Sequence, residues 1–545
     1  MGFYKLKTLF CGQCKSYNSS ICCSIMAHLG FPSFFSLLAC WFFFTARCST
    51  HGKVSCALSW QTDPIAAQDK TVLHDNGIFP DLAVSASSGP IRSEDGIGAL
   101  MPWLDKLYMV SYLSSQNDGS RAGFYAIHPN FTKELLELHN STYANRMIHR
   151  QTNRIIIGAW TVDLQGKIQV FKQLLNVRIG ATAEHLEHPE DMIYHLSMDG
   201  PLYECRLSTM DCKKLFYLPD TLKMPKGEQP HFKAAHTMNG RLVVATNTFF
   251  KPDFMGKVQG GRLAEWEGPG HEWKILEETA FVEISGRRNF GSVIYAVGWD
   301  FRSVILKVYD GSWRTYRLPK ASHAYDQAWQ TEWPRIREVE TERYLMDAHG
   351  MFYELSPLGW AESTWGIRPI SQHLRMVPDF ASYRGFLVMG GNQVSSVMDN
   401  NVITGQAQSG LWFGKTDDLW SFGKPQGWGA VWRNDTVFDQ AVSDPYLMTG
   451  FDKKILHLIL HDTEDKAVKF ILQADITGTA GHRGMEDWVT VESFELPMSS
   501  GDRYNFNSRL LSDFSAHWVR LTAVCTHRET REPSSCTVTA YFYYT

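Results

Sequence analysis

The sequence has no excess of charge of either sign. Lys and Arg number 53 and Asp and Glu number 57, so the formal net charge is −4. Binding to nucleic acid or to an anionic membrane surface usually draws on a surplus of Lys and Arg. We therefore expect neither nucleic acid nor a membrane surface as a partner of the mature protein.

Cysteine is scarce beyond the N-terminal segment. Five of the 11 cysteines follow residue 50, namely Cys56, Cys205, Cys212, Cys525 and Cys536. No CxxC pair or Cys/His spacing among them is typical of structural zinc. Cys205 and Cys212 flank one short segment and Cys525 and Cys536 another, so each pair could close a hairpin in an oxidising compartment. The pairing of Cys56 stays open.

Long apolar runs are also few, and the clearest one lies near the N-terminus. Three lysines precede the uncharged run FPSFFSLLACWFFFT at positions 31–45. This length suits a signal peptide and falls short of the roughly 20 residues that span a bilayer. We predict a signal peptide over residues 1–49 and a secreted, extracellular protein, with a signal anchor as the alternative.

Three sequons agree with entry into the secretory pathway. Asn130 in NFT, Asn140 in NST and Asn434 in NDT would be glycosylation acceptors there. A single sequon is weak evidence, because many occur by chance.

Helical periodicity is rare, whereas Gly and aromatic residues are common. From about residue 98 to residue 425 one pattern recurs seven times: a short strand, a polar turn, a strongly apolar strand, a Gly/Asp turn and an alternating strand. Repeats of about 40–50 residues with four strands each are typical of β-propellers. We predict an all-β chain with a seven-bladed β-propeller over residues 98–430, rather than an array of β-sandwiches.

The flanking regions lack this pattern. Residues 444–545 contain alternating strands such as AVKFILQAD and HWVRLTAV, which predict a small C-terminal β-sandwich. Residues 50–97 are weakly patterned and form a lead-in segment.

Propeller topology indicates where a site could form. The loops that enter the innermost strands and the turns between second and third strands lie on one face, so distant residues can converge there. Polar side chains at these two places are Arg146, His185, His236, Asn247, Arg302, His323, Tyr325, Arg335, Arg337 and His349. Each has a structural alternative: Arg335 and Arg337, for example, could pair with Glu338, Glu340 and Glu342.

Such a set suits lytic cleavage of a polysaccharide that contains uronic acid. An Arg, or a metal held by His, neutralises the sugar carboxylate and makes the adjacent C–H acidic. His or Tyr can remove that proton and protonate the departing oxygen. Paired carboxylates, which ordinary glycoside hydrolysis requires, are not evident.

The segment from Arg262 to Leu355, including YAVGWDFRSVILKV and YRLPKASHAYDQAWQTEWPR, resembles extracellular bacterial and invertebrate proteins of unassigned role. At the level of the fold these resemble seven-bladed propeller polysaccharide lyases of the ulvan, oligogalacturonide and rhamnose–glucuronate types. The resemblance implies a His/Tyr acid–base pair, a carboxylate-binding Arg and in some members a divalent metal.

By position alone, these roles go to His236, His323 and Tyr325 as catalytic residues. The substrate-binding set is Arg146, His185, Asn247, Arg302, Arg335, Arg337 and His349. No cofactor is certain, and a divalent metal, zinc or calcium, is possible. We therefore expect a secreted lyase acting on an acidic polysaccharide. The alternatives are a propeller that binds glycan or protein without chemistry, and a glycoside hydrolase that depends on a His.

Overall fold

The computed structural model describes residues 94–113, 122–249, 260–286, 293–321, 333–340, 343–355, 367–373, 376–394, 410–461, 465–480, 487–496, 505–511 and 514–545. This part of the chain is all-β. Its helical segments are short: η2 (Lys172–Leu174), α4 (Leu218–Thr221) and η3 (Thr416–Ser421). No helix among these residues is long and apolar enough to span a bilayer.

The first three antiparallel sheets are built from strands that follow one another in the sequence. The first contains β1 (Glu94–Trp103), β2 (Lys106–Leu113), β3 (Ala122–Ile127) and β4 (Lys133–His139). The second contains β5 (Arg146–His149), β6 (Arg154–Ile157), β7 (Trp160–Asp163) and β8 (Ile168–Val170). The third contains β9 (Ile179–Glu184), β10 (Met192–Ser197), β11 (Pro201–Arg206) and β12 (Asp211–Tyr217).

Three more sheets repeat this order of strands, and a seventh sheet has three described strands. The fourth contains β13 (Gln229–Met238), β14 (Arg241–Phe249), β15 (Gly261–Trp266) and β16 (Lys274–Glu277). The fifth begins with β17 (Ala280–Gly286), β18 (Ile294–Trp299), β19 (Val304–Tyr309) and β20 (Trp313–Leu318). The sixth contains β21 (Arg335–Val339), β22 (Arg343–Ala348), β23 (Met351–Leu355) and β24 (Arg368–Gln372). The seventh contains β25 (Phe380–Tyr383), β26 (Phe386–Gly390) and β28 (Leu411–Gly414).

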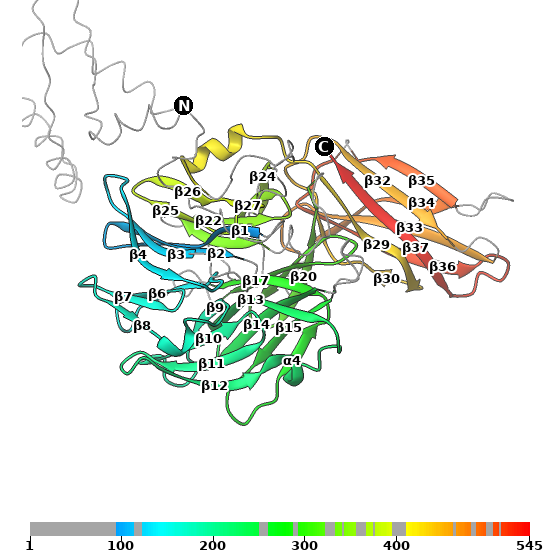
Figure 1. The fold of residues 1–545 in the computed structure, drawn as a ribbon. Coiled ribbons are helices and arrows are strands. Elements are labelled where there is room, and N and C mark those ends of the chain that lie inside the picture. Colours follow the sequence, from blue (N-terminus) through cyan, green and yellow to red (C-terminus); the bar gives the residue numbers. More distant parts are fainter. Residues whose placement is uncertain are drawn as a thin grey trace, which may run out of the picture. The chain divides into compact units, whose positions relative to one another are not determined.

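Neighbouring sheets contact each other through their first strands. The contacts run in the order β1, β5, β9, β13, β17, β21 and β25, and β25 contacts β1 again. Figure 1 shows part of this series, with β9, β13 and β17 side by side. A short strand, β27 (Asn392–Val394), also pairs with the beginning of β1, where Gln393 lies opposite Asp95. The last of these meanders is therefore joined to the first.

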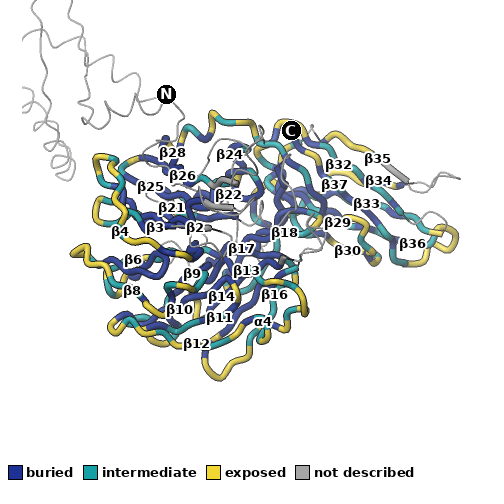
Figure 2. Tube along the Cα trace, in the orientation of Figure 1, coloured by how far each residue is buried: buried dark blue, intermediate teal, exposed yellow. Residues whose placement is uncertain are grey.

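Burial follows the position of a strand within its sheet. Every residue of the second strands β10 and β18 is buried, whereas the fourth strand β12 is half-buried or exposed throughout. Figure 2 shows the same change from dark inner strands to lighter outer edges. Near-continuous apolar runs are typical of strands covered on both faces, so the sequence pattern predicted these middle strands.

Tight turns join several first and second strands. Asn239 and Gly240 both have positive φ, 55° and 70°, between β13 and β14. Positive φ at both central residues is the geometry of a type I′ hairpin, which Asn–Gly favours. In the second sheet, the alternating segment GKIQVF contains the fourth strand, β8, and not the third. The reason is that the four-residue strand β7 follows β6 after a turn of two residues.

The strands after residue 426 form one further sheet and extend the fifth. One sheet has the order β29 (Gly427–Phe438), β37 (Ser535–Tyr544), β32 (Lys454–Leu460) and β35 (Asn505–Leu510). Beyond β20, the fifth sheet continues through β31 (Tyr446–Leu447), β36 (Trp518–His527), β33 (Lys466–Asp475) and β34 (Trp488–Leu496), and β30 (Ala441–Val442) also pairs with β36. Buried side chains of both groups share one apolar cluster, in which the Tyr316 and Trp518 rings lie 4.9 Å apart.

Candidate functional site

A cavity of about 770 Å³ lies where the seven first strands meet. Every one of β1, β5, β9, β13, β17, β21 and β25 contributes lining residues. Four of the predicted site residues are among them: Arg146, His236, Arg335 and Arg337. A concave site of this size with a few convergent polar groups is typical of small-molecule binding sites.

Two buried carboxylates connect three arginines at this cavity. Arg337 donates from Nε to Asp379, 2.7 Å away, and from Nη1 to Glu283, also 2.7 Å away. Arg146 Nε lies 3.3 Å from Asp379, and Arg335 Nη1 lies 3.5 Å from Glu283. Within the described residues, three cations therefore share two anions.

Burial and the two carboxylates shift the pKa values of the arginines in opposite directions. Burial lowers the pKa of Arg146 to about 10, although Asp379 opposes the shift. Burial also lowers the pKa of Arg335. For Arg337 burial again acts downward, but Asp379 and Glu283 outweigh it and raise the pKa. The best-neutralised guanidinium is thus Arg337.

Arg335 is the cation with unused donors. Its side chain is 1% exposed, and Nη1 donates to Pro334 O at 2.8 Å. Nε and Nη2 are buried and have no hydrogen-bond partner among the described residues. The guanidinium lies over the Trp333 ring at 5.0 Å, and Lys233 Nζ lies over the same ring at 4.1 Å. A ring contact does not use the N–H groups of a guanidinium, so Nε and Nη2 of Arg335 remain donors without a described partner.

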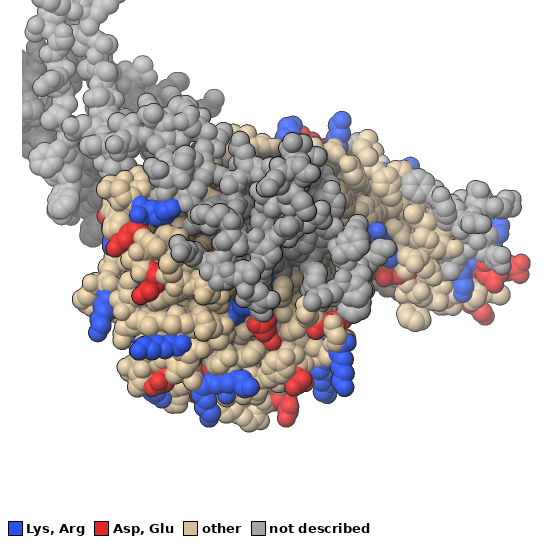
Figure 3. Space-filling model, in the orientation of Figure 1, with Lys and Arg blue, Asp and Glu red and all other residues tan. Residues whose placement is uncertain are grey.

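Charges of both signs lie on the outer surface. On the face shown in Figure 3, Lys and Arg are interspersed with Asp and Glu over the coloured residues. This agrees with the net charge of −4. The cavity is also mixed in charge, because Glu184, Glu283, Glu338 and Glu340 line it together with the arginines.

Other predicted site residues have different surroundings. His185 follows the end of β9, and its Nε2 lies 2.8 Å from Glu204 while its ring stacks on Tyr194. Asn247 is buried on β14 opposite His231. Neither residue lines the cavity. His236 does line it, but from near the end of β13 rather than from its start.

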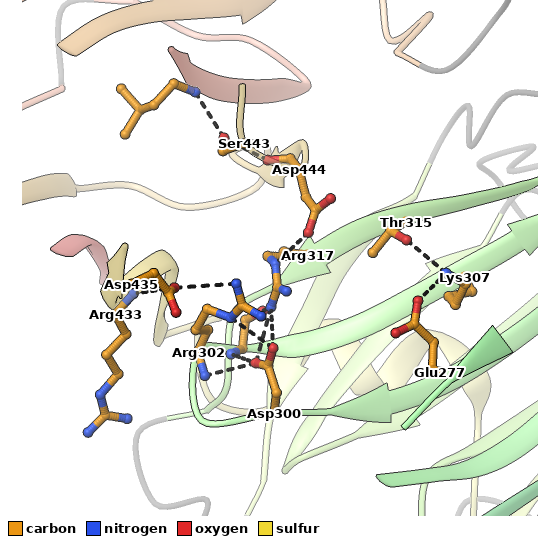
Figure 4. Close-up of polar contacts among 12 residues, drawn as sticks. Glu277, Asp300, Arg302, Lys307, Thr315, Arg317, Arg433, Asp435, Ser443 and Asp444 are labelled. Carbon is orange, nitrogen blue, oxygen red and sulfur yellow. Dashed lines mark hydrogen bonds and ion pairs between the residues drawn. The ribbon is translucent and has the colours of Figure 1, made fainter. Parts of the chain in front are cut away.

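Arg302 contributes to a contact between β29 and the turn that joins β18 and β19. It donates to Asp300 at 3.0 Å and to Asp435 at 3.3 Å, and Asp300 also accepts from Arg317 (Figure 4). Arg317 in turn donates to Asp444 at 2.8 Å. Arg302 therefore stabilises the contact with the C-terminal strands instead of facing the cavity.

His349 also lies in a turn and does not line the cavity. It occupies the tight turn between β22 and β23 with a φ of 50°, and its ring lies 5.1 Å from that of Trp299. Burial and nearby Lys320 hold its pKa well below the ordinary value, so the ring is neutral. His323 and Tyr325 lie outside the described residues.

Sequence reasoning missed the two carboxylates that bind the three arginines, and it missed one amide that lines the cavity. Glu283 and Asp379 are 4% and 0% exposed, and each is a lone acid in an otherwise apolar segment, VEIS and VPDF. A single charge within an apolar strand is the signal that could have identified them. Asn145, directly before β5, also lines the cavity.

The described residues contain no group of three or more His, Cys, Asp or Glu placed to hold a metal ion. A divalent metal, zinc or calcium, therefore stays a prediction.

The predicted Cys205–Cys212 disulfide is present and joins directly opposed residues of β11 and β12. A Cys525–Cys536 disulfide is not formed in the structure. Cys525 pairs with Val468 and Cys536 with Val437, so the two buried thiols belong to different sheets. The three sequon asparagines, Asn130, Asn140 and Asn434, are exposed.

No protein-family model matches the chain, and no curated protein matches it. Several solved structures are similar to it at low identity. The β-propeller domain of Cps50 (Swd1) from Myceliophteria thermophila is 10% identical, with a TM-score of 0.35 over 57% of this chain and 95% of that one. The WD40 repeats of RRP9 are also 10% identical, with a TM-score of 0.36 over 62% of this chain and 98% of that one. An acylaminoacyl peptidase from Pyrococcus horikoshii has 9% identity and a TM-score of 0.32, covering 54% and 48%.

Proposed function

We propose that this protein is a secreted seven-bladed β-propeller that binds the carboxylate of an acidic polysaccharide in the cavity between its first strands. Support for seven blades comes from the cyclic order of contacts between the first strands. The strands after residue 426 would form an appended β-sandwich. Support for the ligand comes from Arg335, whose Nε and Nη2 donors have no described partner.

A carboxylate suits these donors. A guanidinium binds a carboxylate through two parallel N–H···O bonds, and such charge-assisted bonds are stronger than neutral ones. A bound anion would also balance the third cation of the Arg146, Arg335 and Arg337 set, which shares only two described carboxylates. A buried, uncompensated charge is costly, so anion binding should be favourable.

The activity that we propose at this site is β-elimination. Arg335 would neutralise the uronate carboxylate and make the neighbouring C5–H acidic. A base would take that proton while the electron pair forms the C4–C5 double bond and the C4–O bond breaks. An acid would protonate the departing oxygen. His236 lines the cavity and is the candidate for one of these roles, with His323 or Tyr325 for the other.

Binding and cleavage can be tested separately. Calorimetric titration with D-glucuronate should show binding, and Arg335→Gln should weaken it by roughly tenfold or more, because bonds to charged groups contribute about 1.5–3 kcal/mol. Arg368→Gln is the matched control, since the Arg368 side chain is exposed and pairs with Glu354 away from the cavity. Unchanged affinity in Arg335→Gln would contradict the proposed site.

Cleavage of the polysaccharide can be followed by ultraviolet absorbance. Incubation with ulvan, pectic fragments or gum arabic should raise the ultraviolet absorbance of unsaturated uronate, and His236→Ala should slow that rise. Binding with intact polymer would favour the alternative of a glycan-binding propeller without chemistry. Reducing sugar without unsaturation would instead identify a hydrolase.

A further inference from the structure

Asn145 is a second polar group of the cavity with an unused hydrogen-bonding atom. Its side chain is 1% exposed and it lines the cavity next to Arg146. Its Nδ2 donates to Gly158 O at 2.9 Å and to Thr182 Oγ1 at 2.8 Å. Its Oδ1 is buried and has no hydrogen-bond partner among the described residues.

The orientation of this amide is determined by its partners. Gly158 O can only accept a hydrogen bond, so the atom that faces it must be the NH₂ group. Both Nδ2 protons are then used, by Gly158 O and Thr182 Oγ1. The remaining atom, Oδ1, can only accept.

Thr182 is itself held by a buried histidine. Thr182 Oγ1 lies 2.8 Å from His195 Nδ1, and burial lowers the pKa of His195 to about 3, so that ring is neutral. Because Oγ1 accepts from Asn145, its own proton is available for Nδ1 of the neutral imidazole. The series Asn145, Thr182, His195 therefore keeps the Asn145 side chain in one orientation.

We propose that Asn145 Oδ1 accepts a hydrogen bond from a hydroxyl group of the ligand. This inference rests on the proposed function and adds to it a residue that recognises the hydroxyl groups of the sugar acid. A buried acceptor without a partner is costly, and a site built for a hydroxyl discriminates strongly against analogues that lack it. Asn145 is thus a specificity-determining residue, whereas Arg335 binds the charge.

The affinities for two ligands distinguish hydroxyl recognition by Asn145 from carboxylate binding by Arg335. D-Glucuronate carries a carboxylate and ring hydroxyls, and tetrahydropyran-2-carboxylate keeps the ring and the carboxylate but has no hydroxyls. Asn145→Ala should weaken glucuronate binding by roughly five- to tenfold and leave the affinity for tetrahydropyran-2-carboxylate unchanged. Arg335→Gln should weaken both. The control is Asn176→Ala, because Asn176 is exposed and does not line the cavity.

A second variant covers the case in which Asn145→Ala does not fold. Thr182→Val keeps nearly the same shape and leaves Asn145 bonded to Gly158, so it should give a smaller loss that is again specific to glucuronate. Equal losses for both ligands, or no loss for either, would overturn the role of Asn145. If the wild-type protein binds neither ligand, or Arg335→Gln leaves both affinities unchanged, the proposed function itself fails.

Discussion

Asp379 connects the last of the seven meanders to three others, and replacing it should destabilise the protein strongly. It directly precedes β25 and is 0% exposed. One carboxylate oxygen accepts from Arg337 Nε at 2.7 Å. The other accepts from the backbone N–H of Leu100 on β1 at 2.7 Å and lies 3.3 Å from Arg146 Nε on β5.

The expected loss in the free energy of unfolding can be worked out from the groups that lose their partner in Asp379→Ala. Breaking a buried ion pair by removing one partner costs about 3–5 kcal/mol, because the other charge stays buried. A buried N–H that loses its acceptor, here that of Leu100, costs about 1–3 kcal/mol. These costs overlap, and water in the adjacent cavity can solvate part of the exposed charge. We therefore expect a loss of about 4 kcal/mol in the free energy of unfolding.

Urea denaturation followed by tryptophan fluorescence measures this loss without screening the ion pairs. Asp379→Asn should be less damaging, because it keeps an acceptor for the Leu100 N–H. Asp105→Ala is the matched control: its partner Arg384 belongs to the turn between β25 and β26, but the Asp105 side chain is 61% exposed, so about 0–1 kcal/mol is expected. If Asp379→Ala stayed within about 1 kcal/mol of the wild type at an unchanged denaturant slope, the carboxylate would not hold these strands together.

Two buried histidines, one partly buried carboxylate and the disulfide each contribute to stability in a way that can be measured. Burial lowers the pKa of His139 to about 4 and that of His195 to about 3, so the unfolded chain binds these protons first as pH falls below about 6.5. Stability should therefore be full above pH 6.5 and fall by roughly 1.4 kcal/mol per pH unit for each ring between pH 6.5 and the pKa of that ring in the folded protein. His195→Phe should flatten this slope in urea denaturation at several pH values. Burial raises the pKa of Asp300, but Arg317 and Arg302 outweigh it and hold the pKa below its ordinary value. The contribution of Asp300 to stability should therefore be present above about pH 4 and lost in stronger acid. Asp300→Asn should remove this loss of stability in acid. Replacing Cys205 and Cys212 together by Ala should cost about 2–3 kcal/mol, read as a lower Tm, given that the disulfide closes a short loop with a sequence separation of 7.

Strand positions could be predicted from sequence because they depend on local pattern. Apolar runs such as LVVAT and VIYAVGW lie in β14 and β18, which are buried as second strands. The partners of charged residues depend instead on the contact between sheets. Glu338 and Glu340 were the nearest candidates for Arg335 and Arg337 in sequence, yet both arginines contact Glu283, more than 50 positions away on β17. No local pattern contains that information.

The same reasoning explains why only part of the predicted site is brought together. The rule that inner-strand entries and second-to-third turns share a face places Arg302 and His349 in the set. It does not consider what else covers that face. Arg302 contacts Asp435 on β29, and His349 packs on Trp299. A residue on a predicted functional face can therefore be used by a neighbouring part of the chain.

The C-terminal strands extend the β17–β20 sheet and cover its edge at β20. Arg317 is 3% exposed, its Nε donates to Asp444, and its backbone N–H donates to Pro445 O at 2.8 Å. Its backbone also pairs with Tyr446 on β31, and Tyr316 Oη donates to Ala480 O at 2.7 Å. A chain truncated after residue 426 would lose these partners and leave β20 as an open, partly apolar edge, which favours aggregation.

We therefore expect the truncated chain to be insoluble or to elute as aggregate in gel filtration, whereas the full chain remains soluble. Arg317→Ala in the full chain is the milder test, since it removes one junction residue and leaves the edge of β20 covered; it should lower Tm without aggregation. A soluble truncated chain that keeps the β-rich circular dichroism spectrum would contradict this dependence. The seven meanders would then be independent of the C-terminal strands, and the ion pairs of Asp300 and Arg317 would stabilise only the junction.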